Sequence, residues 1–486
     1  MLTMPEHYHY ILDWTLLILG HIAGIIGAIH ALMTKKDPRA ALGWTIVCIM
    51  LPGLGVILYC LFGINRIKSL ALEWKSYGLS DVQHNTNAAF PRVHAKPESN
   101  YSLPEHYLGL IKTGNEVLKL RLSPGNALSV LLDGTEAYPK MIEAINNAKQ
   151  SVYLSTYIFG ATGIGSAFID ALAAAHNRGV EVKVLIDGVG VMYSWPSSYY
   201  RLRRKKVPVS LFLPPFRSWY YALHLNLRCH AKILVVDGKV GFTGGMNIHD
   251  SNYNPSGDPL IHDMHFQVNG PIIGQLQDVF LRYWYFSTKQ QPKKIVYYDD
   301  TEQGSILCRG IDAGPYHEFP QLQVMLCAAV NGATTRIRIM TPYLILGYPL
   351  SSALGAAALR GVNVEIILPE ANNLSFVKGA SEAMMPGLLA QGVHFYYRPG
   401  IFAHTKLFMV DEACAIIGSS NLDTRSFYLN FEFNLEVYNQ AFTDQLNLYF
   451  DKIKFSSHVI TSEWLQSQAF GIKLRNSIFK LFSPYL

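Results

Sequence analysis

The sequence predicts an α/β protein in which two α/β/α sandwich halves, related by pseudo-twofold symmetry, follow an N-terminal transmembrane helical hairpin. Three observations predict this fold. Two long apolar segments lie near the N-terminus, the rest of the chain alternates between helix-like segments and short apolar strands, and the segments of its first part recur in the same order in its second part. Alternating helices and apolar, β-branched strands are typical of a sheet covered by helices.

The two apolar segments comprise residues 11–33 and 41–63. The first contains one acidic residue, Asp13, near its edge, and the second contains no charged residue. Each is long enough for a helix to cross the bilayer core of about 30 Å, which takes roughly 20 residues. We therefore predict a membrane anchor over residues 1–66. The alternative is a pair of buried core helices, while a cleaved signal peptide fits less well because no Lys or Arg precedes the first segment.

The charges beside these segments do not decide the orientation of the anchor. The link between them carries Lys35, Lys36 and Arg39, whereas the N-terminal tail has neither Lys nor Arg. Taken alone, this pattern places the link in the cytoplasm and the bulk of the chain outside it. Basic residues also follow the second segment, at positions 66, 68 and 75, and point the other way. The six cysteines form no C-x-x-C pair, which favours a reducing, cytoplasmic compartment for the bulk.

Three pairs of segments define the repeat. Residues 144–156 match 329–341, residues 171–186 match 353–368, and a histidine-containing motif occurs in both parts. Each half therefore reads as a helix, a buried strand, a helix ending at a glycine, a second strand, and a strand pair that carries the motif. We place the first half at residues 121–295 and the second at 296–486. Residues 67–120 are interpreted as a connector, because 80–104 are rich in Asn, Ser, His and Pro.

The repeated motif is H-x-K followed by Asp and then by a glycine-rich stretch that ends in Asn. The first copy consists of His230, Lys232, Asp237, Gly244, Gly245 and Asn247. The second copy consists of His404, Lys406, Asp411, Gly418, Ser419 and Asn421. One such match is a weak signal, but two copies with the same strand pattern and the same downstream offsets are not plausibly accidental. The chain therefore carries a duplicated catalytic half-site.

The residue types of the motif suit the binding of a phosphate. On a strand, the His and Lys of each copy point to the same face, so the two lysines can converge on phosphate oxygens. Asn247 and Asn421 supply amide donors, and the glycines allow close approach of the backbone. We include Gly245 and Ser419 among the phosphate-binding positions.

The acidic residues of the two copies are candidates for supporting roles. Asp237 and Asp411 belong to the catalytic motif, but in a regular strand they point to the face opposite the lysine, so we assign them to fixing the local hairpin. Asp263 lies 33 residues after His230, and Glu432 lies 28 residues after His404. We predict that each of these two carboxylates orients the histidine of its own half by holding one tautomer of the imidazole.

Two histidines facing one phosphodiester suggest a division of labour. One imidazole would attack phosphorus and form a covalent phosphohistidine, while the other would protonate the leaving oxygen and then deprotonate the incoming alcohol or water. The symmetry of the sequence does not choose between them. A catalytic metal is the alternative, with His224 and His230, or His262 and His265, as ligands. We expect no metal and no cofactor, because each motif pairs His with a cation and ligand spacing is lacking.

The charge distribution indicates an anionic partner. The net charge of +6 suits a protein that works against anionic lipid or nucleic acid. A basic run at residues 201–206 is followed by an aromatic stretch at 212–223, a pairing that favours a membrane interface although it could also stack bases. The C-terminal tail from Glu463 looks amphipathic and suits either a membrane surface or ordinary packing.

With both motifs in place, the chain resembles the phospholipase D superfamily, whose signature is H-x-K-x4-D followed by G-G/S-x-N. Within it, the chain is similar over essentially its full length to the bacterial cardiolipin synthases of the two-transmembrane type. Segments 44–63, 156–159, 421–427 and 481–484 add to this similarity. The resemblance implies two phospholipase D-like halves, a multi-pass protein of the bacterial inner membrane, and a metal-free phosphatidyl transfer between two phosphatidylglycerol molecules that yields cardiolipin and glycerol.

The resemblance also implies that His230 is the nucleophile and that His404 is the acid and base. One departure is His262, which stands before Asp263 where a larger basic or aromatic residue is expected; it bears on substrate preference and not on the chemistry. The expected partners are phosphatidylglycerol and anionic membrane lipid, with no nucleic acid. The alternatives are a membrane-bound phospholipase D-type hydrolase, another phosphatidyltransferase of the same superfamily, a nuclease, or a non-catalytic membrane scaffold. The second substrate, phosphatidylglycerol or phosphatidylethanolamine, stays open.

Overall fold

The computed structural model describes residues 6–35, 38–63, 103–215, 227–290, 299–317 and 319–483. The chain divides into two compact units, an N-terminal unit, Met1–Glu73, and a C-terminal unit, Trp74–Leu486. The predicted connector up to residue 102, and positions 216–223 of the aromatic stretch, lie outside the described residues.

The N-terminal unit begins with helix α1 (Glu6–Thr34). Its portion Asp13–Thr34 is long and apolar enough to cross a membrane, in agreement with the first predicted transmembrane helix. Large apolar side chains on this portion are exposed, such as Leu16 at 59 % and Ile26 at 63 %. Exposure of this kind is expected for a helix whose surroundings are lipid rather than water.

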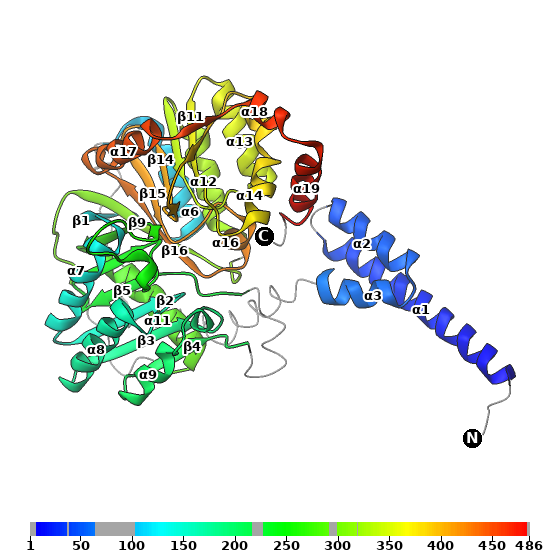
Figure 1. Ribbon diagram of the computed structural model, residues 1–486, viewed down its shortest axis with the longest axis horizontal. Helices are drawn as coiled ribbons and strands as arrows, with labels where there is room; N and C mark the ends of the chain where they lie inside the picture. Colours follow the sequence, from blue (N-terminus) through cyan, green and yellow to red (C-terminus); the bar gives the residue numbers. More distant parts are fainter. Residues whose placement is uncertain are drawn as a thin grey trace. The chain divides into compact units, whose positions relative to one another are not determined.

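The prediction of a second continuous helix over residues 41–63 is wrong. Helix α2 (Pro38–Met50) is followed by a turn, by the short helix α3 (Leu54–Leu58) and by the π-helical turn η1 (Tyr59–Gly63). Pro52 has no backbone N–H to continue the helix, and Gly53 adopts a φ of 74°. The backbone N of Gly53 donates to the carbonyl oxygen of Gly20 at 3.3 Å, so the turn lies against the middle of α1. Figure 1 shows α2 and α3 beside α1.

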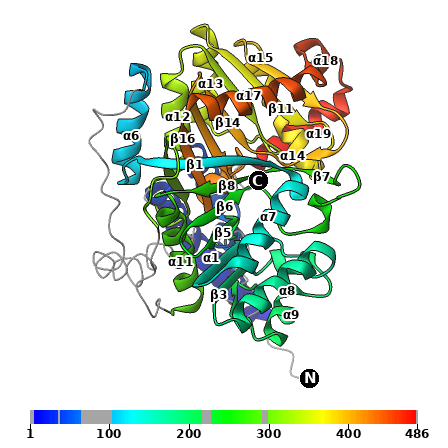
Figure 2. The same ribbon diagram turned by 90° about the vertical axis from the view of Figure 1, so that its left-hand side faces the viewer.

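The C-terminal unit is organised by one sheet, which contains fifteen strands among the described residues. Antiparallel pairing of β1 (Ser123–Leu132) with β9 (Ile306–Ala313) joins the two halves at its centre, and Figure 2 shows β1 running between them. Outward from β1 the order is β8 (Met264–Asn269), β6 (Val240–Gly244), β5 (Ile233–Val236), β2 (Ser151–Thr156), β3 (Glu181–Asp187) and β4 (Val209–Phe212). Outward from β9 it is β16 (Glu432–Tyr438), β15 (Cys414–Gly418), β14 (Leu407–Val410), β10 (Arg336–Met340), β11 (Asn363–Pro369), β12 (His394–Arg398) and β17 (His458–Ile460).

The matching strand order agrees with the predicted pair of related halves. In the first half, β2 pairs in parallel with β3, and β3 pairs in parallel with β4. In the second half, β10 pairs in parallel with β11, and β11 with β12. Each half has its own buried apolar cluster. The repeat did not reveal β1 and β9, the two strands that join the halves, since its matched segments begin with the following helices.

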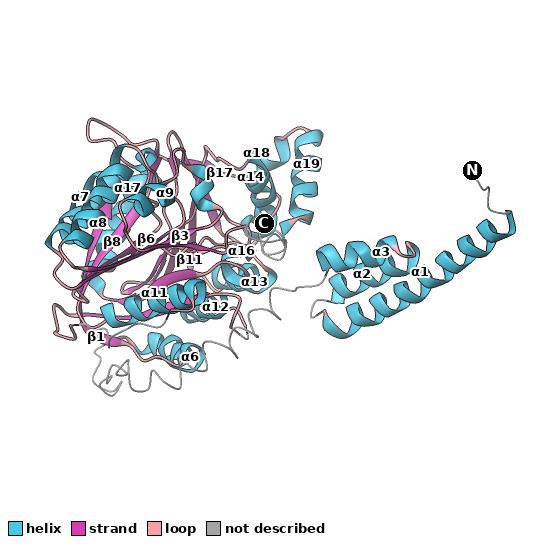
Figure 3. Cartoon of the chain, turned by 90° about the horizontal axis from the view of Figure 1, so that it is seen from below, coloured by secondary structure: helices cyan, strands magenta, loops and turns pink. Residues whose placement is uncertain are grey.

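Helices cover both faces of the sheet, as Figure 3 shows. The helices that match between halves are α7 (Asp133–Asn147) with α12 (Gln321–Gly332), α8 (Gly163–Asn177) with α13 (Tyr348–Leu359), and α11 (Ile273–Thr288) with α17 (Gln440–Phe455). As predicted, α8 and α13 end at glycines in the left-handed region, Gly179 at φ 86° and Gly361 at φ 94°. The basic run lies on α9 (Ser198–Arg204) and beyond, and its Arg201 donates to Ser166 Oγ at 2.9 Å.

The described part of the predicted connector is attached to the second half. It forms η4 (Glu105–Tyr107) and α6 (Leu108–Leu118), and α6 packs against α12. Tyr107 is 2 % exposed, and its hydroxyl donates to the carbonyl oxygen of Val410 and accepts from the backbone N of Ala413, both at 3.1 Å. A segment that precedes the first half therefore supports the motif hairpin of the second half.

The C-terminal tail is both a packing element and an amphipathic one. After α17 it forms most of α18 (Ser462–Ser467) and all of α19 (Phe470–Leu481), whereas the short helix α16 (Thr424–Tyr428) lies earlier, just after the second motif stretch. Helix α19 packs on α14 (Ser375–Glu382), where the buried Asn476 donates to Glu382 Oε2 at 2.8 Å. Away from this contact, Phe470 and Leu481 are 77 % and 75 % exposed. The remaining helix of this region, α15 (Met385–Leu389), lies between α14 and β12.

Candidate active site

Both H-x-K motifs lie immediately before a strand, not within it as predicted. His230 and Lys232 precede β5, and His404 and Lys406 precede β14. In each copy the Lys Nζ donates to the carbonyl oxygen of the motif histidine, at 2.6 Å for Lys232 and 2.5 Å for Lys406. Each lysine therefore folds back over its own histidine. Burial lowers the pKa of Lys232, and the two ammonium groups lie close enough for Lys406 to lower it further.

The two motif histidines face each other across the junction of the halves. Their ring centroids are 6.5 Å apart and the rings are inclined at 75°. The backbone N of His230 donates to the carbonyl oxygen of Phe431 at 2.9 Å, and that of His404 donates to the carbonyl oxygen of His262 at 2.7 Å. Each histidine is thus held by the backbone of the opposite half. The separation leaves room for one phosphorus centre between the rings.

The orienting carboxylates are exchanged between the halves. His230 Nδ1 lies 3.0 Å from Glu432 Oε2, and His404 Nδ1 lies 2.8 Å from Asp263 Oδ2. The prediction that each histidine uses the carboxylate of its own half is therefore wrong, although both carboxylates are in the site. The exchange follows from two short parallel contacts, between β7 (Ile261–His262) and β13 (Phe402–Ala403) and between residues 229 and 431. They set the segment before each carboxylate against the segment before the opposite histidine.

The two carboxylates are fixed by different groups. Glu432 accepts from Ser419 Oγ at 2.5 Å and from Asn430 Nδ2 at 3.2 Å. Asp263 accepts from the backbone N of Met264 at 2.8 Å. The position that matches Ser419 is Gly245, where a Cβ atom would lie 2.5 Å from Asp263 Oδ1. The two predicted phosphate-binding positions Gly245 and Ser419 thus lie directly against the orienting carboxylates.

Asn247 and Asn421 end the glycine-rich stretches at equivalent places. Asn247 Oδ1 accepts from the backbone N of Ile158 at 3.1 Å, which fixes the amide and leaves its NH2 group as the donor to a ligand. Asn421 is 5 % exposed, and its Oδ1 has no hydrogen-bond partner among the described residues. Its backbone N donates to Ser426 Oγ at 3.2 Å.

Asp237 and Asp411 hold the motif hairpins to the neighbouring strand of their half. Both have a left-handed backbone, with φ of 53° and 54°. The Asp237 carboxylate accepts from the backbone N atoms of residues 149, 150 and 151 just before β2. The Asp411 carboxylate accepts from the backbone N atoms of residues 334, 335 and 336 just before β10 and from two threonine hydroxyls. Among the described residues, these acids contact loop backbone and hydroxyl groups, and Asp411 also contacts His106, but neither contacts a motif histidine or lysine.

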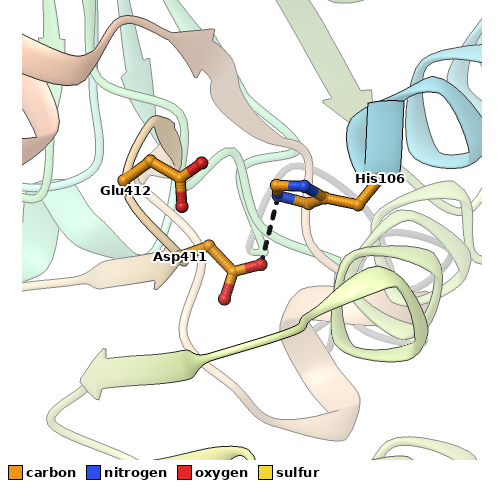
Figure 4. Close-up of side chains that lie close together, drawn as sticks. All are labelled: His106, Asp411 and Glu412. Carbon is orange, nitrogen blue, oxygen red and sulfur yellow. Dashed lines mark ion pairs between the residues drawn. The ribbon is translucent and has the colours of Figure 1, made fainter. Parts of the chain in front are cut away.

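Among the described residues, one group of side chains has the spacing of a metal site: His106, Asp411 and Glu412, shown in Figure 4. His106 Nε2 lies 3.3 Å from Asp411 Oδ2. Both oxygens of Asp411 already accept hydrogen bonds from Thr334, Thr335 and Arg336, so the carboxylate is committed to the loop. The group therefore has the chemistry of a structural link between η4 and the second motif hairpin.

The electrostatics of the site favour an anionic ligand. Burial lowers the pKa of Lys232 to about 7 and that of Lys406 to about 8. Burial, followed by the neighbouring Lys406, lowers the pKa of His404 to about 4. Burial also lowers the pKa of His230, against the opposing effect of Glu432. A phosphodiester anion in the site would oppose this lowering and would favour the charged forms of the two lysines and of His404.

The two orienting acids remain ionised in this surrounding. Burial alone raises the pKa of a carboxyl group, but Lys406 and His404 lower the pKa of Asp263, and His230 and Lys232 lower that of Glu432. Each carboxylate is therefore available to stabilise an imidazolium ion on the histidine beside it.

Aromatic side chains line the site beside both histidines. The ring of Tyr157 lies 5.3 Å from that of His230, and Lys232 Nζ lies 5.6 Å from the Tyr157 ring centroid. Tyr343 and Phe402 lie 6.3 Å and 6.0 Å from His404. Tyr343 and Phe402 were not identified from the sequence. The available signals were the position of Tyr343 just after β10 and that of Phe402 two residues before His404.

A third residue not identified from the sequence is Asp133, which holds the segment that carries Asp263. Its backbone N donates to the carbonyl oxygen of Asp263 at 3.0 Å, and its Oδ1 accepts from the backbone N of Asp263 at 2.9 Å. Its Oδ2 lies 2.9 Å from Nδ1 of His262, the residue that departs from the expected pattern. Asp133 itself has a left-handed φ of 56°. Asp133 therefore holds both the backbone N and the carbonyl oxygen of Asp263, the residue that orients His404.

Comparison with known proteins assigns the family. The family described as "Cardiolipin synthase, PLD-like domain" matches residues 141–284 and 326–454, and these two stretches contain the two H-x-K motifs. The chain belongs to the cardiolipin synthase family. A second family, "Phospholipase_D-nuclease N-terminal", matches residues 22–63 of the N-terminal unit.

Similar proteins of this family extend over the whole chain. Cardiolipin synthase A of Pseudomonas putida KT2440 is 31 % identical, with 99 % of this chain and 100 % of that protein covered. Cardiolipin synthase 1 of Staphylococcus epidermidis RP62A is 30 % identical, with 97 % and 98 % covered. The crystal structure of phosphatidylserine synthase from Haemophilus influenzae Rd KW20 has a similar fold, with a TM-score of 0.61 and 15 % identity over 78 % of this chain and 100 % of that one.

Proposed function

We propose that this chain is a cardiolipin synthase, a phosphatidyltransferase that joins two phosphatidylglycerol molecules into cardiolipin and releases glycerol. The observation that carries the proposal is the pair of facing histidines, 6.5 Å apart, in a chain similar to cardiolipin synthases over its full length. A phosphodiester between two imidazoles can be attacked from one side while its leaving oxygen is protonated from the other.

In the first step, His230 Nε2 attacks the phosphorus of one phosphatidylglycerol. A phosphorus–nitrogen bond forms, the bond from phosphorus to the glycerol oxygen breaks, and His404 gives its proton to that oxygen. Burial favours the neutral, nucleophilic form of His230, and Glu432 at its Nδ1 stabilises the positive charge that develops on the ring. The phosphate anion restores the positive charge of His404 before the step, because it offsets the burial and the repulsion from Lys406 that lower the pKa of this ring.

In the second step, the neutral His404 takes a proton from a hydroxyl of a second phosphatidylglycerol. The hydroxyl oxygen attacks phosphorus, the phosphorus–nitrogen bond to His230 breaks, and cardiolipin forms. Lys232 and Lys406 offset the negative charge on the phosphoryl oxygens in both steps, and Asn247 donates from its amide. In these two steps His404 transfers both protons, and the steps use only side chains of the site and the two lipids, without a metal or a cofactor.

The principal competing function is hydrolysis by the same intermediate, with water as the acceptor in the second step. Transfer to a lipid hydroxyl requires a water-poor site at the membrane. The aromatic residues Tyr157, Tyr343 and Phe402 beside the histidines support such a site, as does the apolar helix α1 in the same chain. The same features support lipid over nucleic acid as the substrate.

The product profile from defined lipids tests the proposal. Detergent-solubilised full-length protein is incubated with phosphatidylglycerol, and the products are separated and identified by mass. Equal amounts of cardiolipin and glycerol support the synthase, whereas phosphatidic acid as the main product would contradict it. Adding phosphatidylethanolamine in a second reaction decides whether that lipid can replace one phosphatidylglycerol, which would give ethanolamine instead of glycerol. Activity that is lost with a chelator and restored by a divalent cation would contradict the metal-free steps.

The enzyme belongs to a membrane-associated family, and we place it in the inner membrane of a bacterium with its active site against anionic lipid. We propose that the C-terminal unit lies on the cytoplasmic side. The buried or half-buried free cysteines suit a reducing compartment.

A further inference from the structure

We propose that the N-terminal unit crosses the membrane once, and that α2, α3 and η1 form a re-entrant segment that enters and leaves the bilayer on the cytoplasmic side. This inference uses the proposed function only for the type of membrane. The bilayer is the partner of the surface that this segment exposes. The proposal replaces the two complete crossings expected from the two apolar stretches of the sequence.

The direction of the chain after the turn carries the proposal. Gly53 N bonds to Gly20 O in the middle of α1, and six residues later the hydroxyl of Tyr59 lies 2.8 Å from His30 Nδ1. At the end of the segment, Lys35 Nζ donates to the carbonyl oxygen of Gly63. The segment from residue 53 to 63 therefore runs in the same direction as α1 and finishes at the level of Lys35, where α1 ends.

The dimensions show that the turn does not reach the far side of the membrane. The membrane-length part of α1 has 22 residues, which rise about 33 Å in an α-helix. Helix α2 has 13 residues, which rise about 20 Å. From Lys35 back to Gly20, the level of the turn, α1 rises about 22 Å. The turn therefore lies roughly two-thirds of the way across, and α1 alone continues to the opposite surface.

The turn is built to remain in an apolar medium. Its large side chains are exposed, with Met50 at 74 %, Leu54 at 56 % and Ile57 at 57 %. Backbone groups in the bilayer core must find partners within the protein. The N–H groups of residues 51, 53, 54, 55 and 57 all donate to backbone carbonyl oxygens, and Pro52 has none to satisfy.

Glycines allow the segment to pack closely on α1 and on itself. A Cβ atom at Gly24 would lie 2.5 Å from the carbonyl oxygen of Cys48, and one at Gly55 would lie 2.1 Å from that of Val47. Small residues at helix contacts are the usual means by which helices associate in lipid. The re-entrant segment is therefore a packed part of the unit and not a loop that happens to fold back.

This arrangement settles the orientation that the charges leave balanced for two crossings. With Gly63 at the level of Lys35, the chain leaves the membrane on the side where α1 ends. In the sequence, Lys35, Lys36 and Arg39 stand before the re-entrant segment and further basic residues, at 66, 68 and 75, follow it, whereas residues 1–13, on the other side of α1, contain no Lys or Arg. Basic flanks mark the cytoplasmic side. The N-terminus is outside, and the C-terminal unit is in the cytoplasm.

Cysteine labelling of the full-length protein tests the topology. The six native cysteines are replaced, and Thr3→Cys, Asp37→Cys or Ser69→Cys is introduced one at a time, none of which alters a basic residue. Right-side-out membrane vesicles are treated with a membrane-impermeant maleimide before and after permeabilisation. We expect Thr3→Cys to react in sealed vesicles, and Asp37→Cys and Ser69→Cys to react only after permeabilisation.

Opposite behaviour of Asp37→Cys and Ser69→Cys would establish two complete crossings and overturn the proposal. Reaction of both in sealed vesicles would overturn the cytoplasmic side. Cardiolipin formation by each variant is measured separately. Activity is also measured for the natural chain in the same vesicles, and no synthase activity of the natural chain together with the expected labelling would contradict the proposed function and leave the topology standing, so the two failures are distinguishable.

Discussion

The two half-sites share the same motif but differ in how their histidines are supported. His230 is paired with a glutamate, Glu432, which two further side chains, Ser419 and Asn430, hold by hydrogen bonds. His404 is paired with a shorter aspartate, Asp263, which is held by backbone groups and has a glycine against it. The catalytic residues of the two halves are the same, and their surroundings are not.

This difference shows that a duplicated site can become asymmetric without changing the residues of its H-x-K motifs. The carboxylates are exchanged across the junction, so a change beside Asp263 in the first half acts on His404 in the second. Burial and Lys406 lower the pKa of His404 to about 4, which makes its protonation depend on the bound phosphate. An imidazole with such a low pKa is better suited to transferring a proton to and from the substrate than to carrying a permanent positive charge.

The largest expected effect separates the roles of the two histidines. His230→Ala and His404→Ala should each lower cardiolipin formation by about 10³-fold or more, the upper part of the range for acid–base and nucleophilic groups. With a phosphatidyl p-nitrophenyl ester, whose leaving group needs no proton, His404→Ala should release one equivalent of nitrophenol and retain the lipid phosphate on the protein. Intact mass measurement detects the adduct. An adduct in His230→Ala, and none in His404→Ala, would show that the roles are reversed.

The next effect tests the exchanged carboxylates. Glu432→Gln and Asp263→Asn should each lower the turnover of phosphatidylglycerol by roughly 10²- to 10⁴-fold, because the neutral amide no longer stabilises the imidazolium ion. Glu432→Gln should slow nitrophenol release from the activated ester, since it acts on His230. Asp263→Asn should spare this release, since it acts on His404. Glu116→Gln, at a well-exposed side chain, is the control. Equal loss of nitrophenol release in both variants would contradict the exchanged pairing.

Substitution by alanine makes the two half-sites alike at the position that distinguishes them. Gly245→Ala sets a Cβ atom 2.5 Å from Asp263 Oδ1, so the carboxylate has to move, and we expect a loss of about 10- to 100-fold, corresponding to 1–3 kcal/mol for a disturbed buried polar group. Ser419→Ala removes one donor to Glu432, and we expect a loss of about 10-fold at most. Steady-state kinetics compares them, with Gly109→Ala, which has open space, as the control. A larger effect of Ser419→Ala would contradict the expectation that Asp263 tolerates an added side chain at position 245 less well than Glu432 tolerates the loss of the Ser419 hydroxyl.

A smaller effect is expected at Asp133, which supports only one of the two carboxylates. Asp133→Ala removes the side-chain contacts to His262 Nδ1 and to the backbone N of Asp263. It also puts alanine in a left-handed conformation, which costs about 1 kcal/mol. We expect kcat to fall about 5- to 20-fold with little change in KM, the size of effect produced by losing about 1–2 kcal/mol of positioning. Asp133→Asn keeps an acceptor and tolerates the conformation, so it should recover most of the activity. Equal loss in both variants would show that the negative charge of Asp133, and not its hydrogen bonds, supports the activity.

The smallest effect concerns the dependence of stability on pH. The folded protein protonates His404 only near pH 4, whereas the unfolded chain does so near its ordinary pKa of 6.5. Between these values the unfolded state binds more protons, so stability rises as pH rises from 4 to 6.5, with a slope of at most about 1.4 kcal/mol per pH unit. Thermal unfolding in detergent at pH 4.5 and 6.5 should show a smaller difference for His404→Gln than for the natural protein. An unchanged difference would mean that His404 titrates alike in both states.

Much of the fold could be predicted because it depends on local patterns. The repeat, the glycine ends of two helices at Gly179 and Gly361, and the first membrane helix all follow from the spacing of residue types along the chain. The break at Pro52 and Gly53 was missed because both residues are compatible with an apolar segment, and only their backbone conformation shows the turn.

The sequence predicted four side chains that lie together in the structure, but it did not predict how they pair. His230, His404, Asp263 and Glu432 were all named as candidates, whereas the partner of each histidine depends on strand contacts of two residues or fewer, which leave no periodic signal. Asp133 was missed for a similar reason, because its role comes from a left-handed backbone at the end of β1 and not from its residue type.

The continuous sheet has a mechanical consequence for turnover. Because β1 and β9 pair at the junction and each is flanked by a further hydrogen-bonded strand, the two halves are parts of one continuous sheet, and we expect that they do not separate during turnover. The distance between the two imidazoles should then change little. Two lipids would then have to enter the space between the halves one after the other, and the four-chain product would have to leave by the same route. We expect movements of side chains at the entrance, and not a separation of the two halves, to limit the rate of product release.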